Sequence, residues 1–361
     1  MTSSMGTVPV RYARWNGVGS EFTLVSDSTP RVPARGELLV RIDLATVCGS
    51  DLHTVEGRRP SPVPAVLGHE QVGTVLGVGR GGVSCVDGTP VVPGMRVVWS
   101  VTASCGSCDR CARGLTQKCV KLSKYGHQPL LEEAPLTGGF ATHCVVLPGT
   151  AVVAVPDTLP DTVASPASCA TATAAAAMVA AGPVAGRRVL VTGAGMLGLT
   201  VVAMAATAGA SVSAADPDPA RRRQALTFGA REVGDGSAPL GAFDIAMEFS
   251  GHPDGVRTCL DSLAVGGVAV LVGSVSPGQP VALDPEALVR GLHTVVGVHN
   301  YRPEDLLTAV EFLAAHHGSV PFAELVGTAH PLDQVDTAMV AARHGAAPRQ
   351  ALAPGLTGTP V

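Results

Sequence analysis

The chain has 361 residues, of which 46% are hydrophobic, 15% are charged and only 3% are aromatic. This length exceeds the usual size of a single core, and the composition excludes an intrinsically disordered chain, so two folded domains are expected. A formal net charge of -4 and an isoelectric point near 6.2 give no general attraction to phosphate backbones, which argues against nucleic acid as a partner.

The first half of the chain is rich in short apolar runs that are typical of strands. Each run is bounded by Gly, Pro or Ser, and together they predict a β-barrel-like domain. The runs are 36–47, 71–79, 95–104 and 141–148.

From about Ala167 the pattern changes to an alternation of helices and strands. Ala-rich helical residues lead into a strand at 188–195, a helix at 196–209, a strand at 211–216 and a helix at 218–230. This alternation predicts βαβ units in a parallel sheet. The later candidates are strands at 243–251, 267–274 and 294–300, a helix from near Pro303, a helix at 331–339 and one short strand in the Gly/Pro-rich tail.

No targeting or membrane segment is predicted. The first fifteen residues lack a basic stretch followed by an apolar core, and the Ala-rich run near residues 170–181 is interrupted by polar and turn-forming residues. The sequence therefore predicts a cytoplasmic protein without a membrane partner.

Four of the nine cysteines are crowded into fifteen residues. Their C-x2-C-x2-C-x7-C spacing lets four thiolates converge on one tetrahedral ion, which is typical of a closed structural zinc site. Two disulfides or four unrelated thiols are the alternative, but neither explains such crowding in a chain without a signal peptide. The predicted ligands are Cys105, Cys108, Cys111 and Cys119.

A second candidate metal site is spread along the chain. Cys48 lies in VCGSDLH, His69 lies in VLGHE and Cys169 lies in ASCATAT. Each alone has an ordinary explanation, because buried cysteines usually act as small apolar residues and single histidines are seldom ligands. Together they offer two thiolates and one imidazole, a set typical of a catalytic zinc with an open fourth position.

A nucleotide-binding loop is predicted between a strand and a helix, where glycines permit a tight turn and close approach of a pyrophosphate to the helix N-terminus. An ordinary strand-to-helix turn is the alternative. Asp216 ends the next strand, where a carboxylate accepts hydrogen bonds from the adenosine ribose and favours NAD over NADP. Arg221 complicates this choice, because a guanidinium there could hold the phosphate of NADP. The loop is Gly193, Ala194, Gly195, Met196, Leu197 and Gly198.

These motifs, in this order and over nearly the whole chain, resemble the zinc-containing medium-chain dehydrogenase/reductase superfamily of alcohol dehydrogenases. The resemblance implies an α/β protein with a GroES-like β-rich catalytic domain and a Rossmann domain built on a doubly wound parallel sheet. The implied segments are a catalytic domain at 1–166 with a zinc lobe at about 100–125, an NAD-binding domain at 167–302, and a return to the catalytic domain at 303–361. It also implies two zinc ions per chain, NAD, and a homodimer or homotetramer.

The resemblance assigns roles around the second metal site. Glu70 corresponds to a carboxylate that approaches the metal during ligand exchange. Ser50 and His53 correspond to a hydroxyl-to-imidazole proton relay, and Asp51 corresponds to the carboxylate that orients the zinc-binding histidine. The expected reaction takes a small-molecule alcohol to its ketone: zinc polarises the substrate oxygen, the relay carries the proton to solvent, and hydride passes to NAD.

Two further residues have implied contacts with the cofactor. Thr173 is similar to a residue that packs against the nicotinamide, and Arg349 is similar to an arginine that reaches the pyrophosphate. Two rival functions remain open at this stage: a metal-free reductase of the same fold, and a non-catalytic zinc and nucleotide binding protein. The presence of every zinc-ligand residue type argues against the first, and the presence of Ser50 and His53 argues against the second.

The substrate is less well defined. Segments 45–59, 97–111 and 123–127 resemble phosphonate-catabolism-associated alcohol dehydrogenases, with polyol and cyclitol dehydrogenases as near relatives. Cationic side chains near these segments suit a phosphono-alcohol, whereas hydroxyl-sized partners such as Glu56, His127 and Asn300 suit a neutral polyol or cyclitol. We favour the neutral polar secondary alcohol. The cations are Arg58, Arg59, Lys121 and Lys124.

Overall fold

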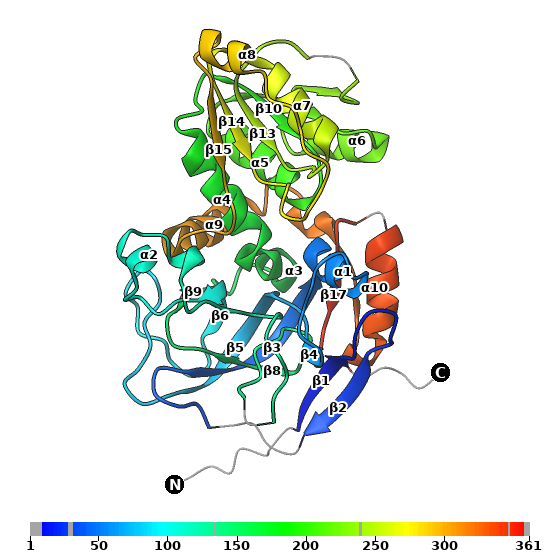
Figure 1. Cartoon of the computed structure of the whole chain (residues 1–361). Helices are drawn as coiled ribbons and strands as arrows, with labels where there is room; N and C mark the ends of the chain where they lie inside the picture. The colour runs from blue at the N-terminus through cyan, green and yellow to red at the C-terminus, as the bar shows by residue number, and fades with distance from the viewer. Residues whose placement is uncertain (1–8, 28–31, 133, 238–239, 346, 357–361) are drawn as a thin grey trace. The chain divides into compact units, whose positions relative to one another are not determined.

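The computed structural model describes residues 9–27, 32–132, 134–237, 240–345 and 347–356. The chain divides into two compact units (Figure 1). Unit 1 comprises Met1–Cys169, Arg302–Ala314 and Phe322–Val361, and unit 2 comprises Ala170–Tyr301 and Ala315–Pro321.

Unit 1 is built on a mixed sheet in the order β16-β17-β3-β5-β6-β7, with β8 paired to β3 and β9 paired to β6. A separate three-stranded sheet has the order β2-β1-β4. The elements are β1 (Val10–Trp15), β2 (Thr23–Asp27), β3 (Leu38–Val47), α1 (Gly49–Val55), β4 (Ala65–Val66), β5 (Glu70–Val78), β6 (Arg96–Ala103), α2 (Asp109–Ala112), η1 (Thr116–Lys118), β7 (Ser123–Lys124), β8 (His143–Val146), β9 (Thr150–Ala154), α3 (Asp161–Ala164), η2 (Ser165–Ser168), η3 (Phe322–Leu325), β16 (Val326–His330), η4 (Leu332–Gln334), α10 (Val335–His344) and β17 (Arg349–Leu352).

Strand β3 changes along its length from a half-buried strand to a fully buried one. Its side chains alternate between buried and accessible as far as Asp43, which is the pattern of a half-buried strand. From Leu44 to Val47 every side chain is buried, because β5 and β17 pair with this end on both sides. The strand therefore delivers the next residue, Cys48, into a buried environment.

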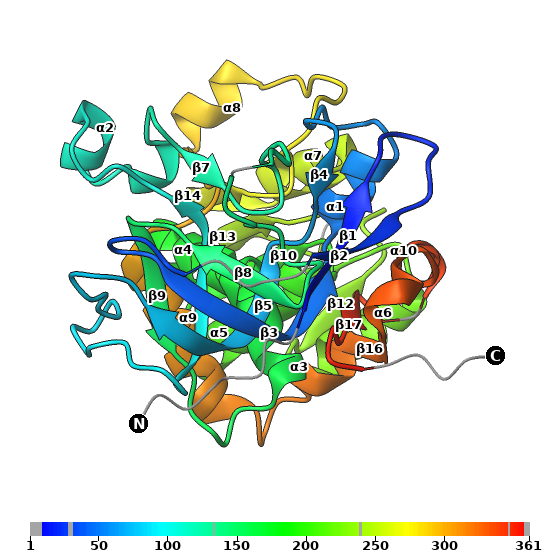
Figure 2. The same cartoon turned by 90° about the horizontal axis from the view of Figure 1, so that it is seen from below.

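The C-terminal part of the chain completes unit 1. Strand β17 pairs antiparallel with β3, and helix α10 packs along β17, as Figure 2 shows. The expected tail strand is thus confirmed, although the expected helix at 331–339 begins as the short 3-10 turn η4 and becomes α10 only at Val335. The sequence patterns did not predict β1, β2 or β16, which are short or largely accessible strands with little apolar alternation.

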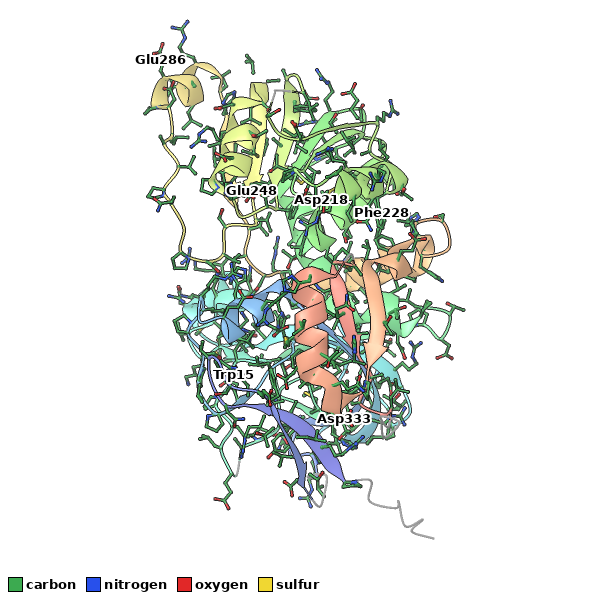
Figure 3. The ribbon with its side chains drawn as sticks, turned by 90° about the vertical axis from the view of Figure 1, so that its right-hand side faces the viewer. Trp15, Asp218, Phe228, Glu248, Glu286 and Asp333 are labelled. Carbon is green, nitrogen blue, oxygen red and sulfur yellow. The ribbon has the colours of Figure 1, made fainter. Side chains whose placement is uncertain are left out.

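Unit 2 contains a six-stranded, fully parallel sheet in the order β12-β11-β10-β13-β14-β15. This is the doubly wound order in which the chain reverses direction across the sheet between β10 and β13, and ligands bind at the carboxyl ends of strands at such a point. Glu248 ends β13 and Asp218 follows β11 (Figure 3). The elements are α4 (Ala170–Ala181), β10 (Arg188–Thr192), α5 (Met196–Thr207), β11 (Ser211–Ala215), α6 (Pro219–Thr227), β12 (Glu232–Gly234), β13 (Phe243–Glu248), α7 (Pro253–Asp261), β14 (Leu263–Leu271), α8 (Pro285–Arg290) and β15 (Thr294–Gly297), while α9 (Pro303–His316) begins in unit 1.

Within the described ranges, no single helix is long and apolar enough to cross a membrane. The consecutive segments Asp161–Ser168 and Ala170–Ala181 reach that length and composition only when they are taken together across a bend.

Candidate metal and cofactor sites

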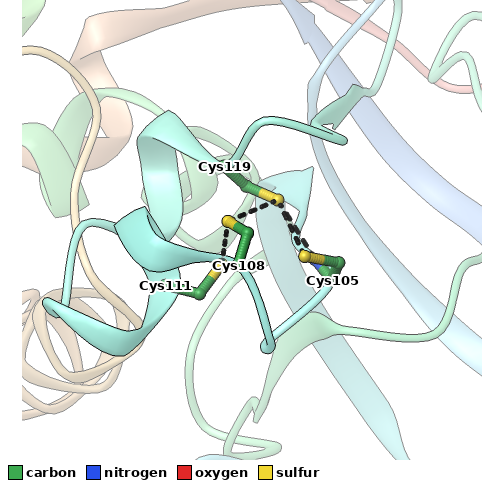
Figure 4. A group of neighbouring side chains, drawn as sticks. All are labelled: Cys105, Cys108, Cys111 and Cys119. Atoms are coloured by element: carbon green, nitrogen blue, oxygen red, sulfur yellow. Dashed lines mark hydrogen bonds between the residues drawn. The ribbon is translucent and has the colours of Figure 1, made fainter.

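The four clustered cysteines converge on one point after strand β6 (Figure 4). Cys108 caps helix α2, Cys111 lies within it, and Cys119 follows η1, so two short helical turns fold the loop back on itself. The sulfurs of Cys108 and Cys111 are 3.5 Å apart, and those of Cys105 and Cys119 are 3.4 Å apart. A tetrahedral zinc with bonds of about 2.3 Å holds its sulfurs about 3.8 Å apart, so the group fits zinc.

Backbone amides stabilise negative charge on these sulfurs. The N–H groups of Cys105 and Lys121 each donate to the Cys119 sulfur at 3.3 Å. The backbone N–H of Ser107 lowers the pKa of Cys105 to about 6, so this thiol ionises near neutral pH. Thiolate is the form that binds metal, and none of the nine cysteines forms a disulfide.

A second group of metal-ligating side chains lies in unit 1. The ligand atoms of Cys48, His69, Glu70 and Cys169 all lie within 4.8 Å of one another. Cys48 begins helix α1, His69 and Glu70 stand at the start of β5, and Cys169 follows η2. Three separate segments thus bring together the two thiols and the imidazole that the sequence singled out.

Asp51 contacts two members of this metal-ligating group, Cys48 and His69. Its carboxylate accepts the backbone N–H of Cys48 at 2.8 Å and lies 3.4 Å from Nδ1 of His69. Burial disfavours charge on this imidazole, but the buried Asp51 carboxylate raises the pKa of His69 to about 10. With Nδ1 directed at Asp51, Nε2 is the atom left for a metal, which is the arrangement that zinc-binding histidines adopt.

The pKa values of the two thiols, Cys48 and Cys169, shift in opposite directions. A hydrogen bond from Cys169 holds the pKa of Cys48 well below its usual range. Burial raises this pKa, whereas the positive charge of Arg349 lowers it further. The buried group therefore already favours one thiolate, and a divalent cation suits its donor set.

Ser50 and His53 occupy one face of α1, three residues apart. The Ser50 hydroxyl lies 3.2 Å from Nε2 of His69, so it is next to the metal-ligating atom. Burial and the charge of Arg58 lower the pKa of His53, which keeps its imidazole neutral below its usual range.

Arg349 has an unexpected position. Its guanidinium donates to both oxygens of Glu70, at 2.7 and 2.9 Å, and lies 3.4 Å from the sulfur of Cys48. The contact that we expected with a cofactor pyrophosphate stays a prediction. Sequence reasoning also missed Thr46 and Ser165, whose hydroxyls bond the side chain and the backbone carbonyl of Glu70 respectively. No motif marks these residues, because only the folding of β3 and η2 against β5 brings them together.

The segment after β7 also reaches this group. The ring of His127 lies 5.5 Å from that of His69, centroid to centroid. Burial and the charge of Lys124 lower the pKa of His127 to about 2, so its ring is neutral. Burial and the charge of Arg59 lower the pKa of Lys124 to about 8.

In unit 2 the glycine loop joins β10 to α5, and the surroundings of its three glycines differ. Gly193 has φ +89, and a Cβ there would lie 2.6 Å from the backbone nitrogen of Ser250. A Cβ on Gly198 would lie 1.8 Å from the Gly193 carbonyl oxygen, whereas Gly195 faces open space. Open backbone at Gly195, directly before Met196 and Leu197 at the helix N-terminus, fits a pyrophosphate.

Asp216 lies beside this loop. Its buried carboxylate accepts the backbone N–H groups of Ala194 at 2.8 Å and Asp218 at 2.9 Å. The half-exposed Arg221 guanidinium lies 3.9 Å from one oxygen of this carboxylate. Thr173 is a buried residue of helix α4 in the same unit.

Two family models match the chain. The one described as "Alcohol dehydrogenase GroES-like domain" matches residues 34–157, and the one described as "Zinc-binding dehydrogenase" matches residues 197–315. An L-threonine 3-dehydrogenase from Pyrococcus furiosus is 32% identical over 286 residues, covering 74% of this chain and 76% of its own length. A 5-exo-hydroxycamphor dehydrogenase from Pseudomonas putida is 28% identical over 338 residues, covering 87% of this chain and 91% of its own length.

The solved structures agree with these relatives. The crystal structure of an alcohol dehydrogenase from Thermotoga maritima matches with a TM-score of 0.89 and 26% identity, covering 96% of this chain and 99% of that chain. The GroES-like unit and the Rossmann unit that the sequence predicted are therefore both present. The chain belongs to the zinc-containing alcohol dehydrogenases of the medium-chain dehydrogenase/reductase superfamily.

Proposed function

We propose that the protein transfers a hydride between NAD(H) and the carbinol carbon of a polar secondary alcohol, such as a polyol or cyclitol, and forms the matching ketone. The observation that carries this proposal is the buried group of Cys48, His69 and Cys169. Glu70 stands beside these residues, but both of its oxygens are engaged by Arg349. Three protein ligands without a fourth leave one coordination position open for substrate, which is typical of a catalytic rather than a structural metal.

Zinc bound by these three residues would supply a Lewis acid that polarises the substrate oxygen. Ser50 takes the hydroxyl proton of the alcohol at Oγ, and His53 accepts it from Ser50 and releases it to solvent. Asp51 holds the His69 ring in position through Nδ1. The four cysteines of the loop after β6 would hold a second zinc with a structural role, because a site of four thiolates leaves no position for substrate.

NAD is the proposed cofactor. Asp216 stands where the adenosine ribose of a bound dinucleotide lies in this type of sheet, and a carboxylate repels an additional phosphate. Arg221 lies 3.9 Å from Asp216 and is half exposed, so solvent screens its charge more than it screens the buried Asp216 carboxylate. Thr173 against the nicotinamide and Arg349 toward the pyrophosphate are part of the same proposal.

An anionic substrate is the second candidate, and Arg59 is the observation that favours it. Arg58 pairs with Glu56, which also accepts a bond from Arg343 at 3.1 Å. No ion pair engages Arg59 among the residues that the structure describes, and its charge acts on Lys124. The phosphonate group of a phosphono-alcohol would be attracted by the positive charges of Arg59 and Lys124.

Steady-state kinetics with NAD test the proposal. Primary alcohols, polyols, cyclitols and phosphono-alcohols are compared, with Arg59→Ala and Arg58→Ala as a matched pair. We expect the highest kcat/KM with a neutral polyol or cyclitol and small, equal effects of both substitutions. A selective rise in KM for the phosphono-alcohol in Arg59→Ala would establish the second candidate instead, and absence of NADH formation with every alcohol would reject both.

We also propose a cytoplasmic homodimer or homotetramer. Strand β15 forms an edge of the parallel sheet, and large apolar side chains close to it are exposed: Val265 by 78%, Leu292 by 71% and Val289 by 69%. Exposed apolar groups along an open sheet edge favour self-association. Light scattering of the purified chain, with Leu292→Lys as the disrupting variant, measures the assembly.

A further inference from the structure

Only one of the two ring nitrogens of His127 has a hydrogen-bond partner among the described residues. Nδ1 lies 2.9 Å from the backbone carbonyl oxygen of Tyr125. A carbonyl only accepts, so Nδ1 carries the hydrogen and Nε2 of the neutral ring carries a lone pair. Nε2 is buried and has no hydrogen-bond partner within the described residues.

Such an atom is uncommon, because buried polar atoms are nearly always hydrogen-bonded and an unpaired one costs about 1–3 kcal/mol. The ring cannot easily turn away. Tyr125 is buried, its hydroxyl lies 2.8 Å from that of Thr150 and accepts the N–H of Leu147 at 2.8 Å, so the carbonyl that holds Nδ1 is fixed. The acceptor is therefore held in place beside His69.

The positive charges that act on the His127 ring restrict which chemical groups can donate a hydrogen bond to Nε2. Lys124 and Arg59 both act on the His127 ring, and neither has an ion-pair partner in the part of the chain that the structure describes. An ammonium group could donate to Nε2 but would lie next to two cations. A carboxylate or a phosphate dianion would suit the cations but has no hydrogen to donate. A hydroxyl donates one hydrogen bond and accepts others, so it can satisfy both.

We propose that His127 determines substrate specificity by accepting, at Nε2, a hydrogen bond from a second hydroxyl on the carbon next to the reacting carbinol. This inference rests on the proposed function, because it needs the reacting oxygen at the metal group to which His69 belongs. The preferred substrates are then vicinal diols, with Lys124 donating to the oxygen of the second hydroxyl.

The test compares trans-1,2-cyclohexanediol with cyclohexanol, which lacks only the second hydroxyl. Isothermal titration calorimetry measures the binding of each to the zinc-loaded, full-length protein, and NADH formation measures turnover separately. His127→Leu removes the acceptor, whereas His127→Gln keeps an acceptor oxygen near the position of Nε2. His143→Leu is the control, because His143 is a buried histidine of the same unit whose Nδ1 bonds the Thr142 hydroxyl.

We expect the wild-type protein to bind the diol at least about tenfold more tightly than cyclohexanol. His127→Leu should abolish this preference while leaving cyclohexanol within about threefold, His127→Gln should restore most of it, and His143→Leu should leave it unchanged. A diol that binds the wild type no more tightly than cyclohexanol, or a preference that survives in His127→Leu, overturns the inference. Absence of turnover with a retained binding preference would instead count against the proposed function alone.

Discussion

Arg349 and Glu70 form a buried, two-point ion pair. The guanidinium Nε lies 2.7 Å from one carboxylate oxygen, and Nη2 lies 2.9 Å from the other. Burial raises the pKa of Glu70 to about 7 even with Arg349 present, which shows how costly an isolated charge is at this position. The pair links β17, near the end of the chain, to β5.

Breaking this pair should destabilise unit 1. Arg349→Ala leaves a buried carboxylate without its partner, so we expect a loss of about 3–5 kcal/mol in the free energy of unfolding. Denaturant titration followed by tryptophan fluorescence measures it, because both tryptophans, Trp15 and Trp99, are buried in this unit. The control is Arg41→Ala, which breaks an exposed pair with Asp43 and should cost less than about 1 kcal/mol. Equal losses in both variants would contradict the prediction.

Metal content should separate the two zinc sites. The wild-type chain should hold two zinc ions, and each of Cys169→Ser and Cys111→Ala should hold one. Cys169→Ser should keep a folded protein and lose turnover, whereas Cys111→Ala should lower the thermal midpoint because the loop after β6 depends on its ion. Atomic absorption, circular dichroism and NADH formation together measure these effects. Two ions retained in either variant would show that the site is assigned to the wrong residues.

Cofactor preference should depend on Asp216. Wild-type kcat/KM should be higher with NAD than with NADP, and Asp216→Ala should raise the KM for NAD by at least about tenfold, because the ribose loses an acceptor for its hydroxyls. Asp254→Ala, at an exposed residue of α7, is the control and should leave KM unchanged. A wild-type preference for NADP is the result that would refute the role of Asp216.

The pH dependence of kcat/KM should reflect His53. The relay needs a neutral imidazole, and burial together with Arg58 lowers the pKa of His53 below 6.5, so activity should persist below that pH and fall as the ring becomes protonated. Arg58→Ala removes the nearby cation and should move this acidic limb to higher pH. His53→Gln should reduce kcat by about 100-fold or more. An acidic limb that stays in place in Arg58→Ala would argue against His53 as the titrating group.

The sequence by itself determined those features whose chemistry lies in short segments. The four cysteines from Cys105 to Cys119 are close in sequence, so their spacing alone brings the thiols together. The glycine loop before Met196 is likewise local, because its glycines lie within one strand-to-helix turn, in which Gly198 closely approaches the carbonyl oxygen of Gly193. The order of strands and helices after Ala167 follows from apolar periodicity, which one parallel sheet with covering helices satisfies.

Only the tertiary structure decided which distant side chains meet at the second metal group. The pairing of β17 with β3 brings the guanidinium of Arg349 against Glu70 and Cys48, a contact that depends on strand register and that no sequence motif predicted. Likewise, the sequence offered His127 only as one of several polar residues, whereas the fold holds Nδ1 on the Tyr125 carbonyl and leaves Nε2 without a partner among the described residues. Hydrogen bonds and burial arise between segments that are far apart in the chain, so a linear pattern carries the residue types but not their partners.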